Sequence, residues 1–125
     1  MNKYTELSDF EINQKVADLI GATPYPTGLT EYHRSAVCGM ANAIIIKSPR
    51  KVGAFDPCNN PSDAMPIIID NGIAIRPYKT ATPVAFNAEI GEFYGHTVYN
   101  ENVLRAAMEL FLLMKDAENE NNNNG

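Results

Sequence analysis

The chain has 125 residues, of which 45% are hydrophobic and 20% are charged, so we expect one folded domain with one core. Its formal net charge of −5 argues against general nucleic-acid binding, which depends on lysine and arginine contacts with phosphates. The longest apolar stretch, 103–114, is interrupted by Arg105 and Glu109 and is too short to cross a bilayer, so no membrane span is expected.

The first predicted element is an amphipathic helix. Ser8 and Glu11 have the spacing of a capping box, apolar residues recur at helical spacing up to Ile20, and Gly21 ends the helix. Residues 22–36 contain two prolines and a glycine, which predict a loop with a short extended piece. Tyr32, His33 and Arg34 lie in this loop and have the chemistry to meet a planar or anionic ligand, although a solvated loop without a partner is the favoured interpretation.

Strands are predicted at four places. Residues 43–46 form an apolar run before Pro49 and are expected to be a buried strand, and 52–55 are expected to pair as a short strand. Further strands are predicted at 73–77 and 83–88. Residues 89–99 fit neither a helical nor a strand period, so we expect a loop with an edge strand. Together these elements predict an α+β fold: a small, mostly antiparallel sheet of three to five strands packed against about three helices.

The stretch FDPCNNPSDAMPIIIDNG, residues 55–72, organises the rest of the chain. Its beginning predicts a turn, which Asn59 and Asn60 favour, and then a helix. We expect Asp63 to cap that helix, because this start puts Pro66 in the first turn, where no hydrogen bond is lost. An earlier cap at Asn60 would put Pro66 deeper in the helix and cost it a bond. Met65, Ile68 and Ile69 should then share one face, and Gly72 should end the helix.

The last predicted helix covers residues 103–114, with Asn100 or Asn102 as its cap. Because Arg105 and Glu109 are its only charges, we expect it to be covered on most sides, and a homodimer is one way to cover it. Residues 1–116 are therefore expected to form one globular domain. The Asn-rich tail, 117–125, has no apolar residue after Ala117, which predicts disorder.

FDPCNNPSDAMPII, followed by NVLRAAMELFLLM and preceded by LSDFEINQKVADLIG, resembles the NinX-like proteins of lambdoid and related phages. The resemblance covers most of the chain, and it departs from the family pattern at Met65 and Val103. It implies a phage accessory protein of a family whose function is unknown. The two cysteines have no CxxC spacing and no secretory signal precedes them, so we expect the reducing cytosol of the host cell.

No catalytic, metal or cofactor site is predicted. Cys58 lies near a helix start, which favours a thiolate, but no cysteine-hydrolase signature surrounds it, so a packed structural thiol is favoured. A metal site would require His33, His96, Cys38 and Cys58 to converge, and their spacing gives no indication of this. Phosphate-loop and calcium-loop motifs are absent.

Two functions from different classes remain open. The first is binding of a small, nucleotide-like anion, with sequestration of a host defence signal as an analogy from phage biology. We expect Arg50, Lys51 and Arg76 to form one electropositive rim beside Tyr78. The second is a protein-interaction module that modulates a host protein, which is favoured if these cations lie apart. The full set of candidate ligand-binding residues is Tyr32, Arg34, Arg50, Lys51, Phe55, Asn59, Asn60, Arg76 and Tyr78.

Overall fold

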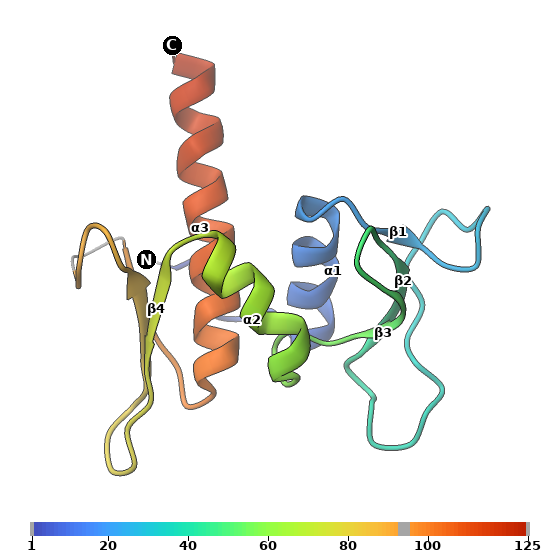
Figure 1. Cartoon of the computed structure of the whole chain (residues 1–125), viewed down its shortest axis with the longest axis horizontal. Helices are drawn as coiled ribbons and strands as arrows, with labels where there is room; N and C mark the ends of the chain where they lie inside the picture. Colours follow the sequence, from blue (N-terminus) through green and yellow to red (C-terminus); the bar gives the residue numbers. More distant parts are fainter. Residues whose placement is uncertain (1, 93–95, 125) are drawn as a thin grey trace.

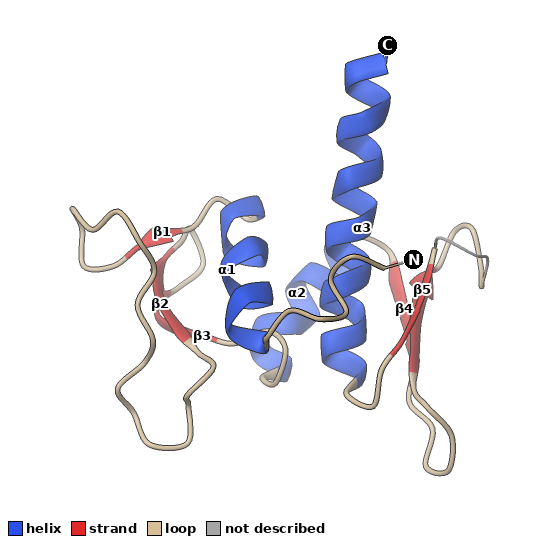
Figure 2. Ribbon diagram, turned by 180° about the vertical axis from the view of Figure 1, so that it is seen from behind, coloured by secondary structure: helices blue, strands red, loops and turns tan. Residues whose placement is uncertain are grey.

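The computed structural model describes residues 2–92 and 96–124, the last four of these by backbone alone, and these residues form an α+β fold as predicted. One antiparallel sheet contains β1 (Thr23–Pro24), β2 (Ile44–Lys47) and β3 (Val52–Phe55). The other contains β4 (Ile73–Arg76), β5 (Val84–Asn87) and β6 (Thr97–Tyr99). The helices lie between the two sheets (Figures 1 and 2).

Strand pairing differs from the prediction of one sheet. Every strand pairs with a neighbour in sequence, and the helix between β3 and β4 carries the chain away from the first sheet before the second begins. The predicted extended piece in the loop 22–36 is β1, and the predicted edge strand in the segment 89–99 is β6. Residues 93–95 of that segment lie outside the described residues.

Helix α1 (Asp9–Leu19) begins as predicted. The Ser8 hydroxyl accepts a hydrogen bond from the Glu11 amide, and the Glu11 carboxylate accepts one from the Ser8 amide, both at 3.1 Å. This carboxylate stays ionised to lower pH because its bonds with Ser8 lower the pKa of Glu11. Gly21 follows the helix at φ +80°, a conformation that favours glycine.

Helix α2 (Pro61–Asp70) begins earlier than predicted. Asn60, not Asp63, is the cap: its side chain accepts a hydrogen bond from the Ser62 amide. Pro66 therefore lies inside the helix. The Asp63 carboxylate does not cap the helix but accepts hydrogen bonds from Lys51 and from the Asp56 amide. The buried face also differs from the predicted one: Ile67 and Ile68 are buried, while Met65 and Ile69 are exposed. Gly72 ends the helix at φ +63°, as predicted.

Helix α3 (Val103–Asn124) passes through the centre of the core. The Asn102 side chain caps it by accepting bonds from the amides of Leu104 and Arg105. Every residue from Arg105 to Leu112 is buried, and α1, α2 and the β4–β6 sheet all contact the helix. One chain thus covers α3, so the helix no longer provides a reason for a homodimer. None of the described helices has the length and hydrophobicity that a membrane crossing requires.

The predicted tail is helical in the structure. Helix α3 continues through 117–124, and Figure 1 shows its end projecting beyond the rest of the fold. Residues 117–120 are exposed, and the backbone bonds of the helix and local pairs such as Lys115 with Glu118 order this part of it. Glutamate is a good helix former, and the helix is already nucleated in the core, which lowers the cost of adding turns.

The stretch 55–60 holds the helices together. Asn13 on α1 donates a hydrogen bond to the Asp56 carboxylate at 2.8 Å and accepts one from the Cys58 amide at 3.3 Å. Asn102, the cap of α3, donates to the Cys58 carbonyl at 2.7 Å and to the Asn59 side-chain oxygen at 3.0 Å. These bonds fix the beginning of α2 against α1 and α3.

Candidate functional site

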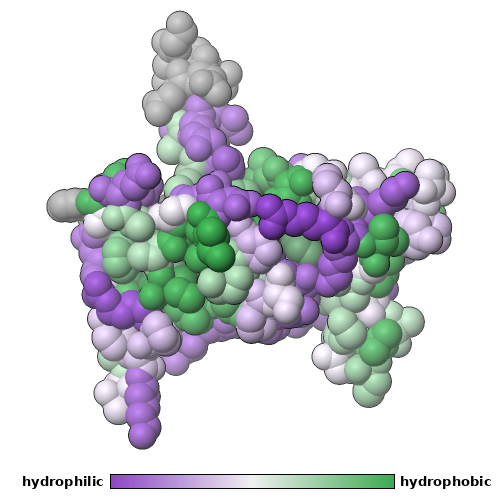
Figure 3. Space-filling model, viewed as in Figure 1, coloured by the Kyte–Doolittle hydropathy of each residue, from purple (hydrophilic) through white to green (hydrophobic). Residues whose placement is uncertain are grey.

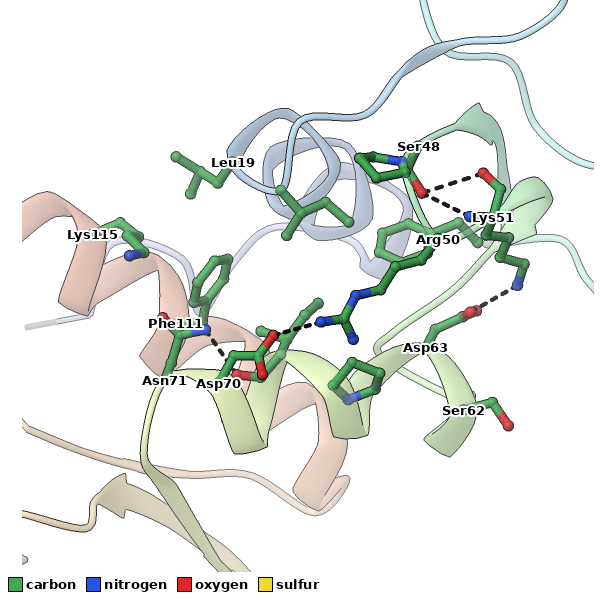
Figure 4. Close-up of a pocket in the computed structure, with 15 residues that line it drawn as sticks. Leu19, Ser48, Arg50, Lys51, Ser62, Asp63, Asp70, Asn71, Phe111 and Lys115 are labelled. Atoms are coloured by element: carbon green, nitrogen blue, oxygen red, sulfur yellow. Dashed lines mark hydrogen bonds and ion pairs between the residues drawn. The ribbon is translucent and has the colours of Figure 1, made fainter.

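A pocket of about 550 Å³ opens where the end of α1, the β2–β3 turn, α2 and α3 meet (Figure 4). Its apolar side includes Phe55, Ile67 and Phe111, which belong to three different elements and are at most 6% exposed. Charged side chains reach it from the β2–β3 turn and from α2. We call this site the Arg50 pocket and define it by Arg50, Lys51, Phe55, Asp63, Asp70, Phe111 and Lys115.

Two ion pairs join the β2–β3 turn to α2. An Arg50 guanidinium nitrogen lies 2.9 Å from an Asp70 carboxylate oxygen, and the Lys51 ammonium lies 2.7 Å from the Asp63 carboxylate. The carboxylates are two helical turns apart on one face of α2, about 10 Å along its axis. Two adjacent cations in the turn therefore meet two carboxylates on the helix, as Figure 4 shows.

A short turn presents these cations. Ser48 donates its amide to the Lys51 carbonyl at 2.7 Å, and the Lys51 amide donates to the Ser48 carbonyl at 3.3 Å. The Ser48 hydroxyl lies 3.2 Å from both the Lys51 amide and the Lys51 carbonyl. Pro49 favours the first central position of such a turn, because its ring fixes φ. The turn therefore holds Arg50 and Lys51 at the end of a hairpin whose next strand delivers Phe55 to the pocket.

The charge of the pocket differs in sign from that of the chain. Among its described lining residues, three side chains are cationic and two are carboxylates, whereas the formal net charge of the whole chain is −5. The third cation, Lys115, comes from α3, lies beside the Phe111 ring and is paired with Glu118. Because each cation has a carboxylate partner, an anion that binds here must exchange with one of these carboxylates, and the apolar wall suits an anion that has an apolar part.

Three of the nine predicted site residues come together here: Arg50, Lys51 and Phe55. Tyr32 and Arg34 pack elsewhere, against α1. The Tyr32 hydroxyl donates to Asp18 at 2.9 Å, and the Arg34 guanidinium stacks 3.8 Å from the centre of the Phe10 ring.

The predicted rim of Arg50, Lys51 and Arg76 is wrong. Arg76 lies on β4 in the other sheet, where it donates to the Tyr78 hydroxyl at 3.2 Å, pairs with Glu92 and stacks on the Phe86 ring. The helices separate this group from the β2–β3 turn (Figure 1). The rim required strands of one sheet to end at one edge, and the chain builds two sheets instead.

Asn59 and Asn60 also lie outside the pocket lining, and both make internal hydrogen bonds. The Asn59 side chain donates to Asp9 at 3.0 Å and to Asp56, and Asn60 caps α2. Asn59 therefore belongs to a turn, as the sequence predicts. Asn60 has the capping role that was predicted for Asp63.

Cys58 is fully buried, and burial together with the nearby Asp9 carboxylate raises the pKa of its thiol well above the usual range. The thiol is thus neutral at pH 7, which fits the predicted structural role. Both cysteines are free. Within the described residues, no group of three or more histidine, cysteine, aspartate or glutamate side chains has a metal-binding arrangement.

The sequence prediction missed Asp63, Asp70, Phe111 and Lys115 as pocket residues. A signal existed for the two carboxylates, since residues seven apart share one face of a helix. It was hidden because the helix was predicted to begin at Asp63 rather than at Pro61. The packing of α3 against α2 brings Phe111 and Lys115 to the site, and the sequence contains no local sign of that contact.

Residues 3–115 match the family described as bacteriophage P22, NinX, and this range contains every residue that lines the Arg50 pocket. The chain belongs to the NinX family. No curated protein and no solved structure shows significant similarity to it. The NinX match ends at Lys115, so the projecting end of α3 lies outside the matched range.

Proposed function

We propose that this NinX-family protein is a non-enzymatic phage accessory protein that binds a small anionic ligand in the Arg50 pocket. The observation that carries the proposal is the combination of an apolar wall, which includes Phe55 and Phe111, with three cationic side chains, of which Arg50 is 65% exposed. Small-molecule sites in proteins commonly have volumes of roughly 300–1,000 Å³ and a few polar groups that orient the ligand. The pocket, at about 550 Å³, falls within this range.

The ligand class follows from these groups. A guanidinium binds phosphate, sulfonate or carboxylate through two parallel hydrogen bonds, and the wall accepts an aromatic or aliphatic body. A nucleotide belongs to this class, and sequestration of a host nucleotide defence signal is the use that we propose for it.

The proposed location is the host cytosol. Both cysteines are free, and Cys38 is exposed, which fits a reducing compartment. A nucleotide signal would also be met there.

The test is to isolate the bound molecule. The full-length protein is purified from phage-infected cells and denatured, and the released small molecules are measured by mass spectrometry. Arg50→Ala is compared with Arg76→Ala, which removes an arginine of the β4–β6 sheet that is also exposed and paired with a carboxylate. We expect an anionic compound from the parent and from Arg76→Ala, and much less from Arg50→Ala. Equal amounts from all three proteins, or none from any, would contradict the proposal.

A second candidate function is a protein-interaction module. The separation of Arg76 from Arg50 and Lys51 favours it, as expected from the sequence for cations that lie apart, and so does the exposed face of α2. Met65 is 36% exposed and Ile69 is 70% exposed, and they lie one helical turn apart. Figure 3 shows a hydrophobic area on the face that carries α2 and β4. A host protein that binds there should be lost with Ile69→Glu, whereas Arg50→Ala should leave its binding unchanged.

A further inference from the structure

The pair formed by Arg50 and Asp70 is open to solvent. The Arg50 side chain is 65% exposed and the Asp70 side chain is 57% exposed, although their charged atoms are only 2.9 Å apart. Exposed ion pairs contribute little to stability, because water screens them and two side chains must be ordered. An anion entering the pocket can therefore replace Asp70 at the guanidinium at small cost.

The neighbouring pair is built differently. The Asp63 side chain is 5% exposed, and besides Lys51 it accepts the Asp56 backbone amide at 2.9 Å. Withdrawing Lys51 would leave a buried carboxylate without its counter-charge, which is costly. Lys51 is therefore held in place, and Arg50 is the cation of the turn that is free to change partner.

Asp70 also lies in the last turn of α2, where a carboxylate faces the negative end of the helix dipole. The residue therefore does not stabilise its own helix. Its carboxylate pairs with Arg50, on the side of α2 that borders the pocket (Figure 4).

We propose that Asp70 is an internal competitor for the ligand of the Arg50 pocket, and that the ligand is an aromatic or other apolar compound carrying one oxyanion that displaces the Asp70 carboxylate from Arg50. This inference rests on the proposed function. It makes Asp70 a specificity-determining residue. Neutral compounds gain no affinity from the exchange, and an anion must bind the Arg50 guanidinium more strongly than the Asp70 carboxylate does.

The experiment uses two fluorescent probes of matched shape. 8-Anilinonaphthalene-1-sulfonate carries one sulfonate, and N-phenyl-1-naphthylamine is its neutral counterpart. Each is titrated into the full-length parent, Asp70→Asn, Arg50→Gln and the double variant. Glu31→Gln is the control, since it removes one negative charge from an exposed loop outside the pocket lining. Thermal melts confirm that each variant keeps a cooperative transition, and Asp70→Ser replaces Asp70→Asn if that variant does not.

Asp70→Asn should bind the sulfonate probe roughly two- to fivefold more tightly than the parent, the range expected for removing an exposed competing ion pair. Binding of the neutral probe should not change. The gain should vanish in the Arg50→Gln background, because the competitor acts only through Arg50.

Three results would overturn the inference: no gain in Asp70→Asn, an equal gain in Glu31→Gln, or a gain that persists without Arg50. The last two would indicate general charge repulsion. If the parent binds the sulfonate probe in an Arg50-dependent way but Asp70→Asn shows no gain, only the competitor role fails. If the parent shows no preference for the sulfonate over the neutral probe, the proposed anion site fails as well.

Discussion

At the scale of single residues, the fold depends on a few buried polar side chains. Arg105 is 7% exposed and bonds the Glu109 and Asp9 carboxylates at 2.7 Å each, as well as the carbonyls of Tyr4 and Leu7. The arginine thus connects α3 to α1 and to the N-terminal segment. The sequence indicates this structural role, because a charged side chain on a buried, apolar helix needs carboxylate or carbonyl partners.

Replacing Arg105 should destabilise the fold strongly. Arg105→Met should lower the free energy of unfolding by about 3 to 5 kcal/mol, because Glu109 remains buried without its counter-charge. Urea denaturation measures the change. The matched control is Arg76→Met, which breaks an exposed pair with Glu92 and should cost less than about 1 kcal/mol. Similar costs for the two variants would show that the buried network does not hold the helices together.

Cys58 should matter for packing only. Cys58→Ser should lower the free energy of unfolding by about 1 to 2 kcal/mol, because a hydroxyl replaces a thiol at a site with no exposed surface. Probe binding in the Arg50 pocket should not change. Cys38→Ser, at an exposed position, provides the control and should be neutral in urea denaturation. A Cys58→Ser variant that melts like the parent but no longer binds would instead indicate thiol chemistry.

At the scale of elements, the sequence predicted the features that depend on a few neighbouring residues. The capping box of α1, the hairpin strands around Pro49 and the glycine after α2 all follow from patterns a few residues long. The beginning of α2 does not follow from such a pattern, because both Asn60 and Asp63 can cap a helix there. Asn60 caps the helix because Asp63 is engaged by Lys51 and by the Asp56 amide, contacts that exist only in the folded chain.

The end of α3 should be dispensable although it is helical. Deleting 119–125 should leave the melting temperature unchanged, since residues 117–120 are exposed. Deleting 116–125 should lower it, because Asp116 accepts a hydrogen bond from the Tyr4 hydroxyl and pairs with Lys3. Thermal denaturation of both truncations measures this. A large loss from the shorter deletion would mean that the last residues dock on the protein.

At the scale of the whole molecule, the sequence predicted the class of the fold but not the arrangement of its sheets. Strand positions were predictable because each strand has a local pattern. Whether the strands join one sheet depends on where α2 carries the chain, and no local pattern encodes that. The same arrangement of two sheets separates Arg76 from Arg50. The packing of α2 and α3 brings Asp70, Phe111 and Lys115 to the pocket instead.

The central claim is that the Arg50 pocket is the anion-binding site of the molecule. The most direct measurement is a titration of the ¹⁵N-labelled full-length protein with 8-anilinonaphthalene-1-sulfonate, followed by amide chemical shifts. Saturable shifts should concentrate at residues 48–51, at the C-terminal half of α2 and around 111–115, and Arg50→Gln should abolish them. Shifts centred on Arg76 and Tyr78, or equal shifts in Arg50→Gln, would contradict the claim.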